Sequence, residues 1–365
     1  MIKEEKINSR QFTLLVIMFT VGSSIIIIPS ALVNESRQDG WISAILAMII
    51  GLLLVWVYTT IGKRYSGKSL PLIIEQVMGK KLGKLIILLY FFFSFTLAAL
   101  VLRNFGDFLN TKIMVETPLE AIHIMFLIPI VYAVKLGIET YSRVAEITFP
   151  FILLLLFLLM VLSVPQIELT NIQPIFGEGI KTITGGSLAM IGVPIFELFI
   201  LTTFFSTVNE PKNIKRSFFI GILIGCSILI LITLFTILIL GVHLTGLKMF
   251  PTYVLAKKIS IADFLQRVEI IVAAVWGITL FFKLVLCFHA SLIMFAKGFS
   301  IKNYRILVIP MSIILFIYSL IAYPNSAYFI EFATKTWLSF GMTFGLVIPL
   351  IILIISFIKK PSKTN

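Results

Sequence analysis

Two ionisable side chains, Glu197 and Lys283, lie inside long apolar segments of this sequence. A charge inside a membrane-spanning segment is unfavourable, so such residues usually serve binding, proton transfer or ion pairing. Glu197 could bind an ammonium group, carry a proton, or pair with a neighbouring helix. Lys283 could be the partner of a carboxylate, or a fixed positive charge standing where a coupling cation would otherwise sit. Arg103 is different, because Asp107 follows it by one helical turn and a local ion pair accounts for it.

The first apolar segment contains poor helix formers near its middle. Gly22, Ser23 and Ser24 interrupt it, and Pro29, which has no backbone donor, follows. A helix that breaks inside a membrane exposes backbone amides that only protein, water or a ligand can satisfy. We therefore expect a half-helix to begin near Ser23 or Ser24, with its amides and positive dipole end available to a carboxylate. The alternative is close helix packing through small residues.

A second apolar segment, residues 186–206, is interrupted at Gly192, Val193 and Pro194. Proline suits the first turn of a helix, where its missing amide is not needed. Glu197 would then lie near the N-terminus of another half-helix, where the dipole favours negative charge. Two interrupted helices in corresponding positions indicate a binding site. We predict that both breaks bind a ligand. Glu197 and Lys283 are predicted to serve charge balance or coupling.

The composition limits the class of protein. The chain has 365 residues, of which 59% are hydrophobic and 13% are charged. A soluble protein of this length could not bury so much apolar surface, so we predict a multi-pass protein of the lipid bilayer. Basic loops of a membrane protein explain the net charge of +13, and we expect no nucleic-acid partner. The sequence shows no nucleophile–base constellation, nucleotide fingerprint or metal-ligand spacing, so we expect no enzyme, metal or cofactor.

The predicted fold is an all-α integral membrane protein with ten transmembrane helices, each near the length of ~20 apolar residues that crosses a bilayer. These helices cover residues 11–33, 41–62, 85–109, 119–136, 144–164, 186–206, 217–241, 268–295, 305–323 and 337–358. Residues 165–184, which contain several Pro and Gly, are predicted to form an irregular loop. Residues 250–267 are amphipathic and predict a helix that lies over the outer mouth or anchors in the membrane interface.

Basic residues predict the orientation. Of the 30 Lys and Arg residues, 20 fall in segments on the side that holds both termini and 8 fall on the other side. The richer side is normally cytoplasmic, so both the N- and C-termini are predicted to be cytoplasmic. Ten helices then divide into two five-helix repeats of inverted topology, with broken helices 1 and 6. The predicted single transmembrane domain, 1–365, contains a first repeat at 10–164 and a second repeat at 185–358.

Several stretches share their order and spacing with a known family. They are Ile7 to Pro29 with its Gly-Ser-Ser break, Asn171 to Gly179, Phe196-Glu197, Asn209 to Ser217, and Phe250 to Glu269 with Phe-Pro-Thr-Tyr and Phe-Leu-Gln-Arg-Val-Glu. Through these stretches the whole chain resembles the B-subunit family of bacterial spore germinant receptors, a branch of the amino acid–polyamine–organocation (APC) transporter superfamily with a LeuT-like fold.

The resemblance implies a subunit in the inner membrane of a dormant spore, associated with an A subunit and a lipoprotein C subunit. Such a subunit recognises a small nutrient germinant, often an amino acid, and triggers release of spore ions and dipicolinate. In amino-acid-binding relatives the first break takes the substrate carboxylate and the second takes the amino group. These breaks map here onto Gly22 to Ser24 and onto Gly192 to Glu197.

The sequence thus predicts a germinant sensor that binds its ligand between helices 1, 3, 6 and 8 and signals to partner subunits by conformational change. Two alternatives stay open. One is a proton- or sodium-coupled amino acid permease, in which Glu197 and Lys283 are the coupling groups. The other is a scaffold subunit of the receptor complex that binds no ligand.

Overall fold

The computed structural model describes residues 5–65, 67–259 and 268–358, and these residues are almost entirely helical. Nine of their helical segments are long and apolar enough to cross a membrane. One of these, Ser24–Arg64, contains the second half of a broken first helix and the whole of the second. With the short apolar helix Ser9–Val21 as the first half, the described residues make the ten crossings that were predicted.

The ten crossings are formed by sixteen elements. They are α1 (Ser9–Val21) with α2 (Ser24–Ser36), α3 (Gly40–Arg64), α5 (Lys80–Lys112), α6 (Leu119–Leu136), α7 (Ile138–Ser163), α8 (Ile180–Met190) with η4 (Ile191–Ile195) and η5 (Phe196–Thr207), α9 (Ile214–Leu247), α11 (Glu269–Gly298), η7 (Tyr304–Leu307) with α12 (Val308–Ile321), and α14 (Trp337–Met342) with η9 (Thr343–Val347) and α15 (Ile348–Ile358). Shorter connecting elements are η1 (Arg37–Asp39), α4 (Leu70–Met78), η2 (Val164–Gln166), η3 (Leu169–Ile172), η6 (Pro211–Asn213), α10 (Pro251–Lys258), α13 (Ser326–Glu331) and η8 (Phe332–Thr336).

Most predicted spans lie close to the observed helices, but helix 3 begins five residues earlier than predicted, at Lys80, and helices 5 and 6 begin six residues earlier. Helix 5 starts at Ile138 and helix 6 at Ile180, so the predicted loop 165–184 was too long. Both helices directly follow a glycine with positive φ, Gly137 at 98° and Gly179 at 82°. Such backbone conformations suit glycine and separate a loop from a helix. The polar residues that follow each glycine are helical, although their polarity favoured a loop.

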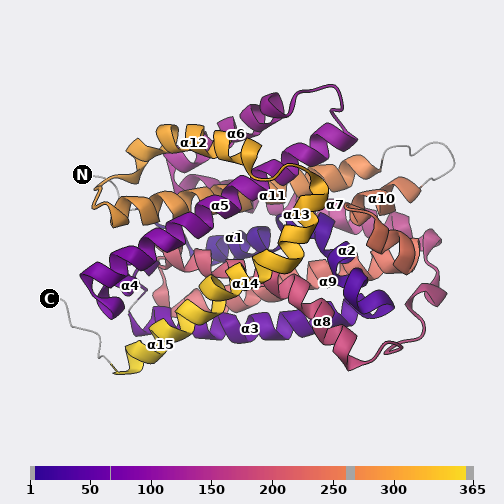
Figure 1. Ribbon diagram of the computed structural model, residues 1–365, viewed down its shortest axis with the longest axis horizontal. Coiled ribbons are helices and arrows are strands. Elements are labelled where there is room, and N and C mark those ends of the chain that lie inside the picture. Colours follow the sequence, from indigo (N-terminus) through magenta and orange to yellow (C-terminus); the bar gives the residue numbers. More distant parts are fainter. Residues whose placement is uncertain (1–4, 66, 260–267, 359–365) are drawn as a thin grey trace.

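The first crossing breaks where the local sequence predicts. A capping box starts α1, in which the Asn8 side chain accepts from the backbone N–H of Gln11 at 2.8 Å. The helix ends at Val21, and α2 begins at Ser24. Figure 1 shows α1 and α2 at the centre of the molecule, enclosed by the other helices. A break at this depth places free backbone groups inside the protein.

Contacts between connecting segments define two ends of the molecule. At the basic end, which carries the Lys- and Arg-rich segments, the Arg64 guanidinium donates to the carbonyl of Ser356 at 2.6 Å. The Glu5 carboxylate at this end accepts from the backbone N–H of Ile138 at 2.8 Å and pairs with Arg305. These contacts join segments that were predicted to lie on one side of the membrane. Which side that end faces stays a prediction.

The N-terminal segment is also joined to the start of α9. The Ser9 hydroxyl donates to the Glu210 carboxylate at 2.8 Å, and the Asn213 amide donates to the same group. These two hydrogen bonds, that from Ser9 first, hold the pKa of Glu210 below its ordinary value of 4.5. The backbone N–H of Asn209 donates to the carbonyl of Ile7 at 2.9 Å. The basic end is therefore tied together by backbone and side-chain bonds.

At the opposite end, α10 packs against the bundle. It contacts α2, α9 and α11, and Leu255 and Ala256 are almost completely buried. The Thr252 hydroxyl donates to the carbonyl of Ile25 in α2 at 2.8 Å. That carbonyl lacks its usual helical donor, because residue 29 is proline. Thr252, within the Phe-Pro-Thr-Tyr stretch, thus supplies the hydrogen bond that Pro29 removes. Residues 260–267 of the predicted amphipathic segment lie outside the described residues.

An aromatic cluster fills the core between the helix breaks and the basic end. The Phe12 ring contacts those of Phe205 and Phe218, with centroids 5.9 and 5.7 Å away, and Tyr58 contacts Phe199 at 5.0 Å. All five side chains are at most 2% exposed. Edge-to-face aromatic packing of this kind makes a dense, water-free layer. The protein is therefore closed on the basic side of the breaks.

Candidate functional site

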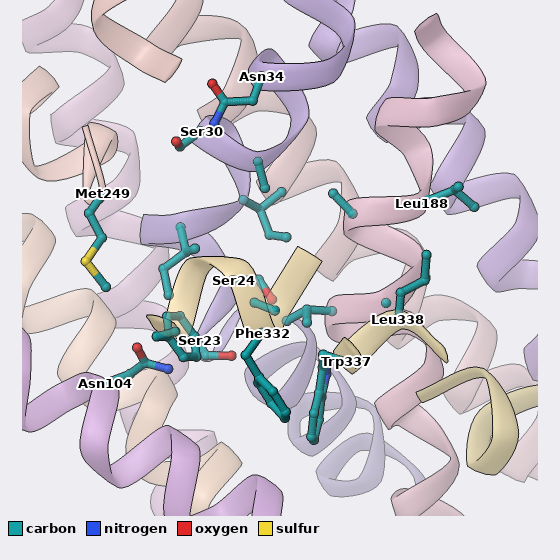
Figure 2. A pocket seen from close by; sticks show the side chains of 18 of the residues that line it. Ser23, Ser24, Ser30, Asn34, Asn104, Leu188, Met249, Phe332, Trp337 and Leu338 are labelled. Carbon is teal, nitrogen blue, oxygen red and sulfur yellow. The ribbon is translucent and has the colours of Figure 1, made fainter. Parts of the chain in front are cut away.

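A cavity of about 370 Å³ lies against the two helix breaks and reaches toward the end opposite the basic one. Its lining includes Ser23, Ser24 and Glu197 at the breaks, and Asn34 and Glu35 at the other end of α2. Asn34 and Glu35 are exposed, so the cavity joins the breaks to the surface. Figure 2 shows the two serines at a distance from Asn34, with the cavity side chains between them.

The start of α2 presents polar groups to this cavity. Ser24 is fully buried, and its hydroxyl has no hydrogen-bond partner among the described residues. Ser23 occupies the N-cap position, but its side chain makes no capping bond to α2. The first amides of a helix have no partner within it, and the dipole there is positive. An orphan hydroxyl beside such amides suits an anionic group such as a carboxylate.

Glu197 and Lys283 form a buried ion pair. The Lys283 ammonium lies 2.6 Å from Oε2 of Glu197, and the two side chains are 0% and 1% exposed. The same ammonium donates to the Ser23 hydroxyl at 2.7 Å. Trp337 donates its indole N–H to Oε1 of Glu197 at 3.0 Å. The structure therefore joins three residues that were predicted separately, from helices 1, 6 and 8, and adds a fourth from helix 10.

Gly22 has a physical role in this arrangement. A Cβ built at this position would lie 2.7 Å from Cδ and 2.9 Å from Cβ of Lys283. Side-chain carbons in contact are ordinarily about 3.5–4.0 Å apart, so no other residue fits without displacing the lysine. Because Gly22 has no side chain, the Lys283 side chain can pass close to the backbone at the break. A role of Gly22 in ligand binding stays a prediction.

The second break lies at Gly192, Val193 and Pro194, as predicted. Val193 has an extended backbone, with φ −137° and ψ 114°, inside an otherwise helical segment. Pro194 cannot donate to the carbonyl of Met190, which therefore lacks its usual helical partner. Gly192, Val193 and Glu197 all line the cavity. The second break therefore lies on the cavity wall, beside α2.

The remaining walls are mostly apolar, and they come partly from helix 10, which was not among the helices predicted to surround the ligand. Leu97, Leu100 and Val101 of α5 line one part, and Phe332 and Trp337 line another. Figure 2 shows these two aromatic rings side by side near Ser23 and Ser24, and their centroids lie 6.1 Å apart. Helix 10 therefore supplies part of the cavity wall. Helix 8 contributes Lys283, which pairs with Glu197 at the second break. Aromatic residues of helix 10 carry no local signal that separates a cavity wall from a lipid-facing surface.

The other ion pairs of the described residues do not line the cavity. Arg103 and Asp107 form the predicted pair at 2.9 Å, at the end of α5. Within the described parts of the chain, no three His, Cys, Asp or Glu side chains come close enough to hold a metal ion. The cavity itself presents hydroxyl groups, the start of α2 and apolar side chains.

Two broken helices around a cavity at mid-depth define this chain as a membrane protein with the LeuT-like transporter fold. Among solved structures, Mhp1, a nucleobase-cation-symport-1 family transporter with bromovinylhydantoin bound, superposes with a TM-score of 0.69 at 12% identity, covering 96% of this chain and 78% of Mhp1. MhsT in complex with L-phenylalanine gives a TM-score of 0.69 at 14% identity, covering 97% and 99% of the two chains. These likenesses confirm the predicted fold.

The chain belongs to the spore germination protein family, whose sequence profile matches residues 6–327. It is 29% identical over 362 residues to spore germination protein KB of Bacillus subtilis (strain 168), covering 98% of this chain and 96% of that protein. Spore germination protein A2 of the same organism is 23% identical over 324 residues, or 88% of each chain. The predicted family membership is therefore confirmed. The assignment of the individual site residues stays a prediction.

Proposed function

We propose that this chain is the germinant-sensing subunit of a spore germinant receptor, and that an amino acid binds in the cavity between the two helix breaks. In this proposal the protein lies in the inner membrane of the spore with both termini in the cytoplasm. The exposed mouth of the cavity then faces outward, where nutrients arrive. Binding is passed to an A subunit and a lipoprotein C subunit, and no covalent chemistry takes place.

The observation that carries this proposal is the orphan hydroxyl of Ser24 at the closed end of a cavity that reaches the surface. A buried polar group without a partner is destabilising by roughly 1–3 kcal/mol, and a ligand that pairs with it removes that penalty. The amides at the start of α2 add donors for a carboxylate. The amino group is left for the carbonyls of the second break, because Glu197 already pairs with Lys283 and Trp337.

Signalling requires that the ligand bind two conformations unequally. The described conformation is closed by the aromatic cluster on the basic side and open on the other. A ligand that contacts both α2 and the second break pulls these half-helices together, and so favours a state in which the cavity is narrower. The partner subunits then read the change in position of these central elements.

Direct binding to the purified chain in nanodiscs tests the proposal. Thermal unfolding is measured with single amino acids and sugars, starting with L-phenylalanine because MhsT was solved with that ligand. A ligand at 100 times its Kd stabilises the folded state by about 2.7 kcal/mol. Ser24→Ala and the cavity-filling Leu100→Trp are expected to abolish the shift. Ser291→Ala is the matched control, because its hydroxyl bonds to the Phe288 carbonyl of its own helix.

Two other outcomes support the alternatives. Gradient-driven, saturable uptake of the bound amino acid into proteoliposomes would identify a permease, in keeping with the transporter fold. If the chain purified with its A and C subunits shows no shift with any amino acid or sugar, the scaffold alternative replaces the sensor.

A further inference from the structure

The Lys283 ammonium occupies the gap between the two broken helices. It lies 2.7 Å from the Ser23 hydroxyl and 2.6 Å from the Glu197 carboxylate. It also lies 5.3 Å from the centroid of the Phe19 ring, within range of a cation–π contact. The side chain is fully buried. A cation held by a carboxylate, a hydroxyl and an aromatic face is thus built into the centre of the protein.

The groups around this ammonium are those that bind a free cation. A carboxylate and a hydroxyl oxygen are hard ligands for alkali and alkaline-earth ions. The α1 helix ends at Val21, beside the same point, and its last carbonyls and negative dipole end favour a positive charge. Without Lys283, Glu197 would be an unpaired carboxylate in a buried site, which is strongly unfavourable. The position therefore requires a cation.

We propose that Lys283 is a built-in cation, which holds the position that an exchangeable cation would otherwise take between Ser23 and Glu197. The site is then complete without sodium, and the joint between helices 1, 6 and 8 does not depend on ions in the medium. A sodium gradient has no exchangeable partner at this position. The inference depends on the ion pair alone, so it stands whether or not an amino acid binds in the cavity.

The lysine is covalently attached to α11 and closely packed at this position. Its side chain crosses directly over Gly22, where a Cβ would lie 2.7 Å away. Trp337 holds the other carboxylate oxygen of Glu197 at 3.0 Å, which fixes the direction of the ion pair. The amine is therefore tethered, unlike a bound ion that exchanges with solvent.

The test measures the thermal stability of the protein in the absence of any ligand. Wild type and Lys283→Ala, in nanodiscs, are compared in sodium, potassium, methylammonium or choline chloride at equal ionic strength. We expect wild type to unfold at the same temperature in all four salts. Lys283→Ala is expected to be less stable in choline, and to regain a few degrees in sodium or methylammonium, which can enter the emptied position.

The double variant Lys283→Met with Glu197→Gln is the control for folding, since it replaces the ion pair by neutral groups of similar size. It is expected to show no difference between the salts. A wild-type protein that is stabilised by sodium over choline would overturn the proposal, and this comparison needs no variant to fold. A folded Lys283→Ala protein that responds to none of the small cations would overturn it as well.

Discussion

Replacing Gly22 by alanine measures how closely the first helix break packs against Lys283. The added Cβ would meet Lys283 carbons at 2.7 and 2.9 Å and the Phe19 carbonyl oxygen at 3.0 Å. Contact between carbons is normally about 3.5–4.0 Å, so Lys283 has to move by on the order of 1 Å. One of the contacts is with Cβ of the lysine, close to its backbone, so the flexible end alone cannot relieve the clash. The ammonium is held by bonds of 2.6 and 2.7 Å.

The expected loss of stability follows from these contacts. Inserting a methyl group into a packed core destabilises by about 1–3 kcal/mol. If the movement also separates the ion pair, the loss rises toward the 3–5 kcal/mol, roughly, of a broken buried pair. The entropy of unfolding is about 2.1 cal/mol/K per residue, and the chain has 365 residues. Dividing the free-energy loss from overpacking by this entropy of unfolding predicts a melting temperature lower by about 1–4 °C.

The assay is thermal unfolding in nanodiscs, with Gly277→Ala as the matched control. Gly277 lies in α11, and a Cβ there would meet its nearest neighbour, Phe105, at an ordinary 3.7 Å. Both substitutions add one methyl group, but only the one at Gly22, in the break between α1 and α2, meets Lys283. Gly277 lies inside α11, where alanine also gains about 1 kcal/mol of helix propensity, so Gly22→Ala is judged against wild type. Equal melting temperatures for Gly22→Ala and wild type would refute the close packing described for the break.

Thr252→Val is expected to destabilise by about 1–2 kcal/mol, because the Ile25 carbonyl then loses the donor that stands in for the missing amide of Pro29. Thr236→Val is the control, since its hydroxyl bonds to a carbonyl one turn earlier in its own helix, and urea or thermal unfolding should separate the two. Glu210→Gln tests the tie at the basic end. A lowered folded-state pKa stabilises only while the carboxylate is ionised, so wild type should exceed the variant at neutral pH. This difference in melting temperature should shrink as the pH falls below 4.5, the ordinary pKa of a glutamate. Melting curves recorded at a series of pH values check this, and a difference that does not change with pH would contradict the reasoning.

The sequence determined the parts of this protein that depend on local chemistry. Apolar runs of bilayer length predicted the ten crossings, because each crossing must bury its own backbone bonds. Gly22 and Pro194 marked the two breaks, since helix propensity and a missing N–H act within one or two turns. The early starts of helices 5 and 6 were missed, because the glycine conformations at 137 and 179 belong to the folded chain.

Only the tertiary structure decided which of these local features meet. The Lys283 ammonium bonds to Ser23, 260 residues away in sequence, and to Glu197 on a third helix. No pattern within one helix specifies such a meeting, because it depends on how whole helices cross and on where glycine lets them approach. The same holds for Trp337, an aromatic residue in an apolar helix, and for Thr252, which donates to the carbonyl that Pro29 leaves without a helical partner. Residue types within a few turns set where this chain breaks, and long-range packing set what those breaks hold.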